Sequence, residues 1–153
     1  MSSPSSVANC ADHTFLHQLA KGTLPLEAFR HYLVQDYHFL GHFARSTALS
    51  AYKSTSLSSI AASAKIILHI QTEVSLHKTF CAEYGVPDHE MEHGEEDLHC
   101  VAYTRWVTDV GTREDWFALQ VAMMPCLLGY GAIGRRLYDD DNTMRGLGSR
   151  FAG

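Results

Sequence analysis

The sequence lacks the features that would place it in a membrane, outside the cell or on nucleic acid. No apolar run approaches the ~20 residues that a bilayer span requires, and the start MSSPSSVANC lacks the apolar core of a signal peptide. The four cysteines include no C-x-x-C pair, and the twelve Lys and Arg are scattered among seventeen Asp and Glu, for a net charge of -5. These absences predict a cytoplasmic protein with free thiols, whose partners are small molecules or proteins, with no nucleic acid and no membrane among them.

Strand signals are also lacking. No segment alternates apolar and polar residues between turn dipeptides, and there are no internal repeats. Apolar residues instead recur at helical spacing, which predicts an all-α fold. With 153 residues, of which 46% are hydrophobic, the chain suits one domain, at the usual scale of ~100–200 residues. That domain is predicted to cover residues 1–141, and the polar, glycine-rich residues 142–153 are predicted to be a disordered tail.

Helix signals divide the chain into five expected helices. The pattern predicts them at residues 12–21, 26–52, 57–84, 96–110 and 116–137. Asp12 is the expected cap of the first helix, and Gly22, Gly85 and Gly111 are expected to end the first, third and fourth. The run HEMEHGEED at 89–97 is too polar for the core and is expected to be a loop or a frayed turn.

A proline lies inside the last expected helix, next to a cysteine. Pro125 has no N–H and clashes with the carbonyl of Val121, which costs ~3 kcal/mol in a helix interior and predicts a kink. Cys126 would then lie beside partly unsatisfied backbone, with Tyr130 one turn further along the same face, and a thiol and a phenol at that spacing suit a nucleophile pocket. The alternative is that Pro125 only bends a surface helix and that Cys126 is a small buried hydrophobe.

A carboxylate falls in the middle of an apolar stripe on the second expected helix. Asp36 shares one helical face with a series of aromatic and aliphatic side chains, namely Phe29, Tyr32, Phe39, Leu40 and Phe43. Burying a lone carboxylate is expensive, so the group needs a partner or an altered pKa. Asp36 is therefore a candidate proton donor or acceptor in a pocket for a polar heterocycle. The alternative is an Asp paired with a structural Arg or with a backbone group.

Two further patterns are weaker indications of a functional site. His69, Glu73 and His77 recur at four-residue intervals on the third expected helix, which would align three possible metal ligands. The alternative is a solvated or hydrogen-bonded face. Tyr103, beside Trp106 in the fourth helix, is typical of a core tyrosine whose hydroxyl is satisfied at the rim.

Four blocks of the sequence carry a family resemblance, in the same order as in that family. They are HTFLHQLAKGTLPLEAFRHYLVQDYHFLGHFARSTALSAY at 13–52, EVSLH at 73–77 before FCAEYGV, AYTRW around Tyr103, and MMPCLLGYGAIGRRL at 123–137. Together they resemble the TenA/thiaminase II family. The resemblance implies a heme-oxygenase-like helical bundle without heme or another cofactor, commonly a homotetramer, that acts in thiamin salvage.

The resemblance also assigns roles to single residues. It implies that Cys126 is the nucleophile that attacks the pyrimidine ring of thiamin or of an aminopyrimidine breakdown product, before water releases hydroxymethylpyrimidine. Asp36 would contact the aminopyrimidine and help to tune the site. Tyr103 and Tyr130 match pocket tyrosines, and Phe39 stands where many members have another tyrosine, so the ring is kept and a hydroxyl is lost.

The sequence departs from the family at its C-terminal end. The family continues for roughly two more helices, which carry a further pocket tyrosine and a glutamate that serves as general acid, whereas this sequence stops at Gly153. The chain is therefore expected to be a C-terminally shortened member. Glu95, Glu96 or a carboxylate of another chain would be substitutes for that glutamate, but nothing in the sequence supports any of them.

Three hypotheses of function follow. The first is a hydrolase of the thiaminase II type, with Cys126 and Asp36 as catalytic residues and Tyr103, Tyr130 and Phe39 binding a small pyrimidine or thiamin. The second is a noncatalytic, shortened paralogue that binds pyrimidine or a full-length partner. The third is a metal-dependent oxidase on the same fold.

Overall fold

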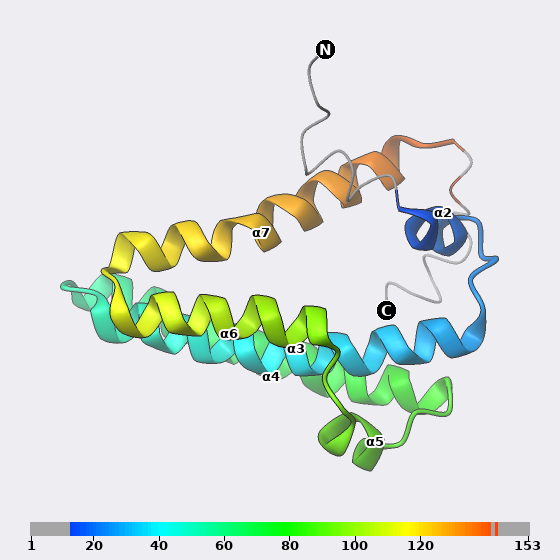
Figure 1. Cartoon of the computed structure of the whole chain (residues 1–153), viewed down its shortest axis with the longest axis horizontal. Coiled ribbons are helices and arrows are strands. Elements are labelled where there is room, and N and C mark those ends of the chain that lie inside the picture. The colour runs from blue at the N-terminus through cyan, green and yellow to red at the C-terminus, as the bar shows by residue number, and fades with distance from the viewer. Residues whose placement is uncertain (1–12, 142, 144–153) are drawn as a thin grey trace. The chain divides into compact units, whose positions relative to one another are not determined.

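The computed structural model describes residues 13–141 and 143, and within them every regular element is a helix (Figure 1). The helices are α2 (Thr14–Ala20), α3 (Leu26–Lys53), α4 (Leu57–Glu83), α5 (Asp88–His93), α6 (Leu98–Arg113) and α7 (Trp116–Asp139). The predicted all-α fold is therefore confirmed. The expected cap Asp12 and, apart from residue 143, the predicted disordered tail 142–153 lie outside the described residues.

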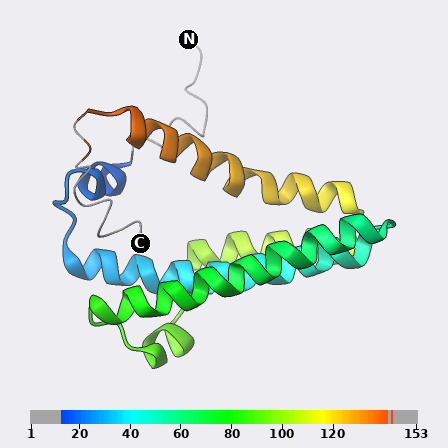
Figure 2. The same ribbon diagram turned by 180° about the vertical axis from the view of Figure 1, so that it is seen from behind.

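The chain divides into two compact units, and each is described by itself. The larger, here called the central unit, comprises residues 26–123 and contains α3 to α6 and the start of α7. In it α3 packs against α4, α5 and α6, so α3 is the helix around which the unit is built (Figures 1 and 2). The smaller unit comprises residues 1–25 and 124–153, with α2 and the rest of α7.

Local side chains set several helix ends. At the starts of α2, α4 and α7 a side chain accepts a hydrogen bond from a backbone N–H two or three residues later; these are His13, Ser56 and Asp115. Each bond satisfies an N–H that has no partner within the helix. Gly22 and Gly85 have positive φ values of 64° and 75° and end α2 and α4 as predicted, since glycine adopts this conformation without a steric penalty.

The prediction that Gly111 ends a helix is wrong. Gly111 lies inside α6, which continues to Arg113. A Cβ at this position would lie 3.0 Å from Leu49 Cδ1 and 3.1 Å from Leu119 Cδ1. The glycine therefore permits α6 to pack closely against α3 and α7, and this need is invisible in the local sequence.

The expected loop at 89–97 is also partly a helix. Residues Asp88–His93 form α5, in which Met91 is fully buried. One methionine thus anchors an otherwise polar helical turn to the central unit. Gln35 of α3 holds the following residues, because its amide donates to Glu95 O at 2.9 Å and accepts from Asp97 N at 2.8 Å.

The core next to the candidate site joins α6 to the start of α7. Its buried members are Val107, Leu119, Ala122 and Met123, with Phe43, Leu49, Tyr103 and Val110 packed against them. The indole Nε1 of Trp116 and the amide Nε2 of Gln120 both donate to Ser50 Oγ, at 3.1 and 2.9 Å. The first turns of α7 are therefore fixed to α3 by both apolar packing and hydrogen bonds.

Leu119 is the position where we expect the largest loss of stability from a core truncation. It is 0% exposed, and Leu119→Ala should lower the free energy of unfolding by about 3 kcal/mol, because the lost transfer energy and the cavity left behind add together. Urea unfolding followed by circular dichroism measures the change. The matched control is Leu98→Ala at a site 78% exposed, where the effect should stay within about 0.5 kcal/mol. Equal effects at the two sites would contradict this packing.

One helix bears on the expectation that the chain does not span a membrane, which stays a prediction. Of the described helices, α7 alone is long and apolar enough to cross a bilayer, judged by length and composition. Pro125, several glycines and Gln120 break its continuous apolar runs, although the segment as a whole remains apolar. One such helix is weak evidence for a membrane span, because core helices of soluble proteins meet the same criteria.

Candidate active site

Asp36 has a partner on the neighbouring helix. Its Oδ2 lies 3.8 Å from Nδ1 of His77 on α4, and the two side chains are 19% and 13% exposed. Burying a carboxylate costs free energy unless the group is paired, and His77 provides such a partner. The partner shown here is a histidine, a type of partner that the sequence interpretation did not suggest.

His77 does not complete the metal-binding column that its spacing suggested. Its Nε2 is 2.9 Å from Leu33 O, whereas His69 and Glu73 form a separate exposed pair at 3.4 Å. Among residues 13–141 and 143, no group of three or more His, Cys, Asp and Glu side chains is arranged to hold a metal ion. The column hypothesis fails because His77 turns toward α3.

Phe39 and Tyr103 form an aromatic wall in the central unit. Their rings stack with centroids 6.4 Å apart and planes at 19°, and Phe39 also stacks on Phe43 at 5.9 Å. The Tyr103 hydroxyl donates to Ala122 O at 3.2 Å, which links α6 to α7. Tyr103 is thus a core-edge tyrosine with a satisfied hydroxyl, and its ring face belongs to the wall.

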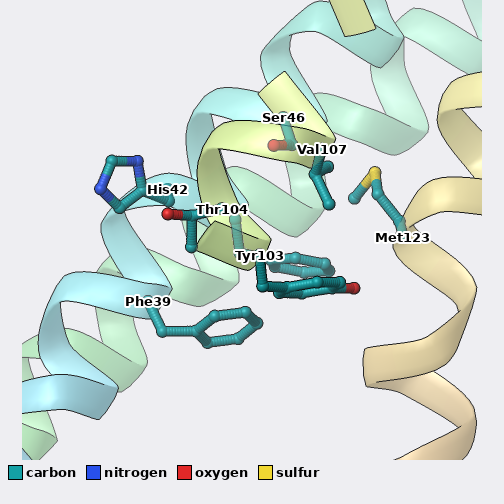
Figure 3. Close-up of a pocket in the computed structure, with 8 residues that line it drawn as sticks. Phe39, His42, Ser46, Tyr103, Thr104, Val107 and Met123 are labelled. Carbon is teal, nitrogen blue, oxygen red and sulfur yellow. The ribbon is translucent and has the colours of Figure 1, made fainter. Parts of the chain in front are cut away.

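A small cavity of about 10 Å³ lies beside this wall, enough for about one water molecule. Figure 3 shows the rings of Phe39 and Tyr103 there, with Met123 reaching in from α7. The lining residues are Phe39, His42, Phe43, Ser46, Tyr103, Thr104, Val107 and Met123. Flat aromatic rings form part of its lining, but the space itself is smaller than a heterocycle.

Cys126 and Tyr130 belong to the smaller unit. Both lie in α7, which continues through Pro125 to Asp139; Cys126 is partly buried and Tyr130 is 52% exposed. Asp36, Phe39 and Tyr103 belong to the central unit. Cys126 and Tyr130 therefore stay predicted members of the site, and the kink at Pro125 also stays a prediction.

A buried histidine on α3 was missed by the sequence interpretation. His42 is 7% exposed, and its Nε2 lies 3.0 Å from Glu96 Oε2 while its Nδ1 lies 3.2 Å from the Arg45 guanidinium. Arginine can only donate, so Nδ1 accepts, and a neutral His42 donates from Nε2 to Glu96. The position of His42 three residues after Phe39, on the same helical face, was the available signal. Glu96 is held by this contact with His42.

His42 also borders a polar hollow of about 520 Å³. Its lining mixes Arg45 with Glu92 and Glu96, and includes His38, whose buried Nε2 has no hydrogen-bond partner within residues 13–141 and 143. Glu92 pairs with Lys78, at 2.5 Å. Because both signs of charge are present, the lining selects no single class of ligand.

Two thiols of the central unit are poor nucleophiles. Burial, followed by the nearby carboxylates Asp36 and Asp88, raises the pKa of Cys81 from 9.0 to about 11. Burial is also the main cause that raises the pKa of Cys100, with Glu96 as the next contribution. Only a thiolate attacks an electrophile, so the raised pKa values make both thiols poor candidates for a nucleophile.

The raised pKa of Cys81 predicts a pH-dependent stability. The pKa is higher in the folded chain than in the unfolded chain, so the contribution is fully present below about pH 9 and is lost as the pH rises through about 11. The two pK units correspond to on the order of 3 kcal/mol. Urea unfolding of the wild type and of Cys81→Ala between pH 8 and 11 tests this. We expect the wild type to lose stability more steeply, and parallel curves would contradict the assignment.

Comparison with known proteins decides the family. The model of the TENA/THI-4/PQQC family matches residues 5–143. The chain belongs to this family. The predicted TenA/thiaminase II resemblance is therefore confirmed, and with it the TenA-like helical fold.

Three similar proteins show what this TenA-family chain is related to. The putative hydroxymethylpyrimidine/phosphomethylpyrimidine kinase 2 of Schizosaccharomyces pombe is 42% identical over 126 residues, covering 82% of this chain and 23% of that protein. The aminopyrimidine aminohydrolase of Halalkalibacterium halodurans is 30% identical over 128 residues, covering 82% and 57%. A crystal structure of a TenA family transcription regulator from Silicibacter sp. TM1040 matches with a TM-score of 0.82 at 38% identity, covering 88% and 60%.

The chain spans only part of these relatives, between about a quarter and three fifths of their length. Their names describe proteins that contain further sequence. Family membership and fold therefore follow directly from the comparisons, whereas activity and substrate are matters for a proposal.

Proposed function

We propose that this chain is a thiamin salvage hydrolase of the thiaminase II type. Its substrate is aminopyrimidine or thiamin, and its product is 4-amino-5-hydroxymethyl-2-methylpyrimidine. The observation that carries the proposal is a half-buried carboxylate, Asp36 of α3, one turn before Phe39, whose ring stacks on Tyr103 of α6. The chain also belongs to the TenA family and is related to an aminopyrimidine aminohydrolase.

The side chains of the central unit suit the binding step. An aminopyrimidine presents an amidine-like edge, and a carboxylate such as Asp36 accepts charge-assisted hydrogen bonds from such an edge. The flat ring can stack on Phe39 and Tyr103. Together these groups orient the exocyclic carbon that must lose its leaving group.

Cys126 supplies covalent catalysis in this proposal. Its thiolate adds to the pyrimidine ring, the leaving group departs with a proton, and water then takes the place of the leaving group as the thiolate is released. The net reaction converts aminopyrimidine and water into hydroxymethylpyrimidine and ammonia. Tyr130, one turn after Cys126 in α7, lines the same face of that helix.

The direct test is product analysis with the purified chain. Incubation with aminopyrimidine should release hydroxymethylpyrimidine and ammonia in equal amounts, and incubation with thiamin should release hydroxymethylpyrimidine and the thiazole alcohol. Liquid chromatography measures the organic products. A folded chain that yields no hydroxymethylpyrimidine from either compound would overturn the hydrolase proposal.

The alternative function is a noncatalytic chain that binds pyrimidine or a full-length partner. Hydroxymethylpyrimidine bound to the native state would raise the melting temperature in proportion to the logarithm of its concentration. A thermal shift without turnover would support this alternative. An unchanged melting temperature at millimolar ligand would count against its ligand-binding form.

We also propose that the chain forms a homo-oligomer in the cytoplasm. Helix α4 exposes several large apolar side chains, Leu57, Ile60, Ile66, Leu68 and Leu76, which is typical of an interface. Light scattering coupled to size-exclusion chromatography gives the assembly mass. A tetramer is expected, and a monomer at micromolar concentration would contradict the proposal.

A further inference from the structure

His77 of α4 is held in a defined tautomer by the backbone of α3. Its Nε2 lies 2.9 Å from the carbonyl oxygen of Leu33, an atom that can only accept, so Nε2 carries a proton and donates it. The opposite ring nitrogen, Nδ1, is then the atom that faces Asp36 Oδ2 at 3.8 Å. Both residues lie in the central unit, where α3 and α4 pack against each other.

This tautomer has a consequence for the charge of the pair. With Nδ1 protonated, His77 is an imidazolium that forms an ion pair with the Asp36 carboxylate. With Nδ1 unprotonated, its lone pair would face the oxygen lone pairs of the carboxylate, which is unfavourable. The geometry therefore suits an ion pair between a protonated His77 and the Asp36 carboxylate.

Other titratable groups also interact with the charge of Asp36. The thiol of Cys81, one turn after His77 on α4, and that of Cys100 on α6 both interact with the charge of Asp36. The further charges that act on these thiols are those of Asp88, Glu96 and Asp97, all of them acidic. His77 is thus a side chain on α4 that can offset the charge of Asp36.

We propose that His77 is a positioning residue that fixes the charge and orientation of Asp36 for the amidine-like edge of the substrate. This role rests on the proposed function, since it gives Asp36 an aminopyrimidine to bind. His77 acts through Asp36 and does not contact the substrate. In the EVSLH block, Glu73 pairs with His69 at the surface, whereas His77 pairs with Asp36 in the candidate site.

Two variants separate charge from packing. In His77→Gln the side-chain amide can still donate to Leu33 O but carries no charge, whereas His69→Gln is a matched control on the same helix at a site 74% exposed. We expect His77→Gln to raise KM for aminopyrimidine about tenfold with kcat changed less than threefold, because Asp36 serves binding. In an Asp36→Asn background the same change should have no further effect. A merely structural role would instead lower the melting temperature and leave KM unchanged.

A spectroscopic test does not depend on activity. The ¹⁵N resonances of the histidine rings report which nitrogens carry protons, so Asp36→Asn should move the Nδ1 resonance of His77 and leave that of His69 in place. If the wild type is inactive and this shift is present, the pairing stands and the hydrolase proposal fails. If the wild type is active but His77→Gln leaves KM unchanged, the positioning role is overturned. An unmoved His77 Nδ1 resonance in Asp36→Asn would overturn the pairing itself.

Discussion

Cys126→Ala is expected to reduce hydroxymethylpyrimidine release from aminopyrimidine by roughly 10³-fold or more in kcat, because it removes the nucleophile while Asp36 and the aromatic wall are retained. The residue is partly buried in α7, so the loss of one sulfur atom should leave the helical content unchanged. Steady-state kinetics with chromatographic detection measures the effect. Binding of hydroxymethylpyrimidine should persist in the variant.

The chain contains its own controls for this substitution. Cys81→Ala and Cys100→Ala each remove a thiol whose pKa is raised by burial, so both variants should retain at least half of the wild-type kcat. A Cys126→Ala variant that keeps more than a tenth of the activity would contradict a thiol mechanism. Equal losses in all three variants would instead indicate a folding defect.

Asp36→Asn is expected to have the second-largest effect, lowering kcat/KM for aminopyrimidine by about 100-fold, the equivalent of about 2.7 kcal/mol. Asparagine keeps the shape of the side chain but removes the charge that pairs with the ring edge and with His77. The activity assay used for Cys126 measures the loss, and circular dichroism checks the fold.

The matched control for Asp36 is Asp97→Asn. Asp97 also pairs with a histidine, His31 at 2.7 Å, but at a site 49% exposed. Its loss should change kcat/KM less than threefold, because an exposed pair contributes little. Comparable losses in the two variants would show that Asp36 has no special relation to the substrate.

Helix existence could be predicted from the sequence because it depends on local periodicity. The expected spans 26–52 and 57–84 differ by one residue at the C-terminal end from α3 and α4. The errors occurred where a distant contact decides the structure. Burial of Met91 turns a polar run into α5, and the close approach of Leu49 and Leu119 keeps Gly111 inside α6. Neither contact can be inferred from the residues next to it in the sequence.

In the candidate site too, local features could be predicted from the sequence, whereas contacts between helices could not. Periodicity placed Asp36 in an apolar stripe and so indicated that it needs a partner, but it could not identify one on another helix. His77 was instead grouped with His69 and Glu73, because spacing along α4 gives a shared face and says nothing of what lies opposite. His42 was missed for a related reason, since its role depends on Glu96, 54 residues away in sequence.

A single-turnover experiment tests the central claim, hydrolysis by way of the Cys126 thiol, most directly. Excess enzyme is mixed with aminopyrimidine, quenched with acid at intervals, and analysed both for hydroxymethylpyrimidine and for mass added to the peptide that contains Cys126. We predict product formation, with a transient pyrimidine adduct on that peptide and neither signal in Cys126→Ala. Product that forms equally in Cys126→Ala, or a folded wild-type chain that gives neither product nor adduct, would contradict the claim.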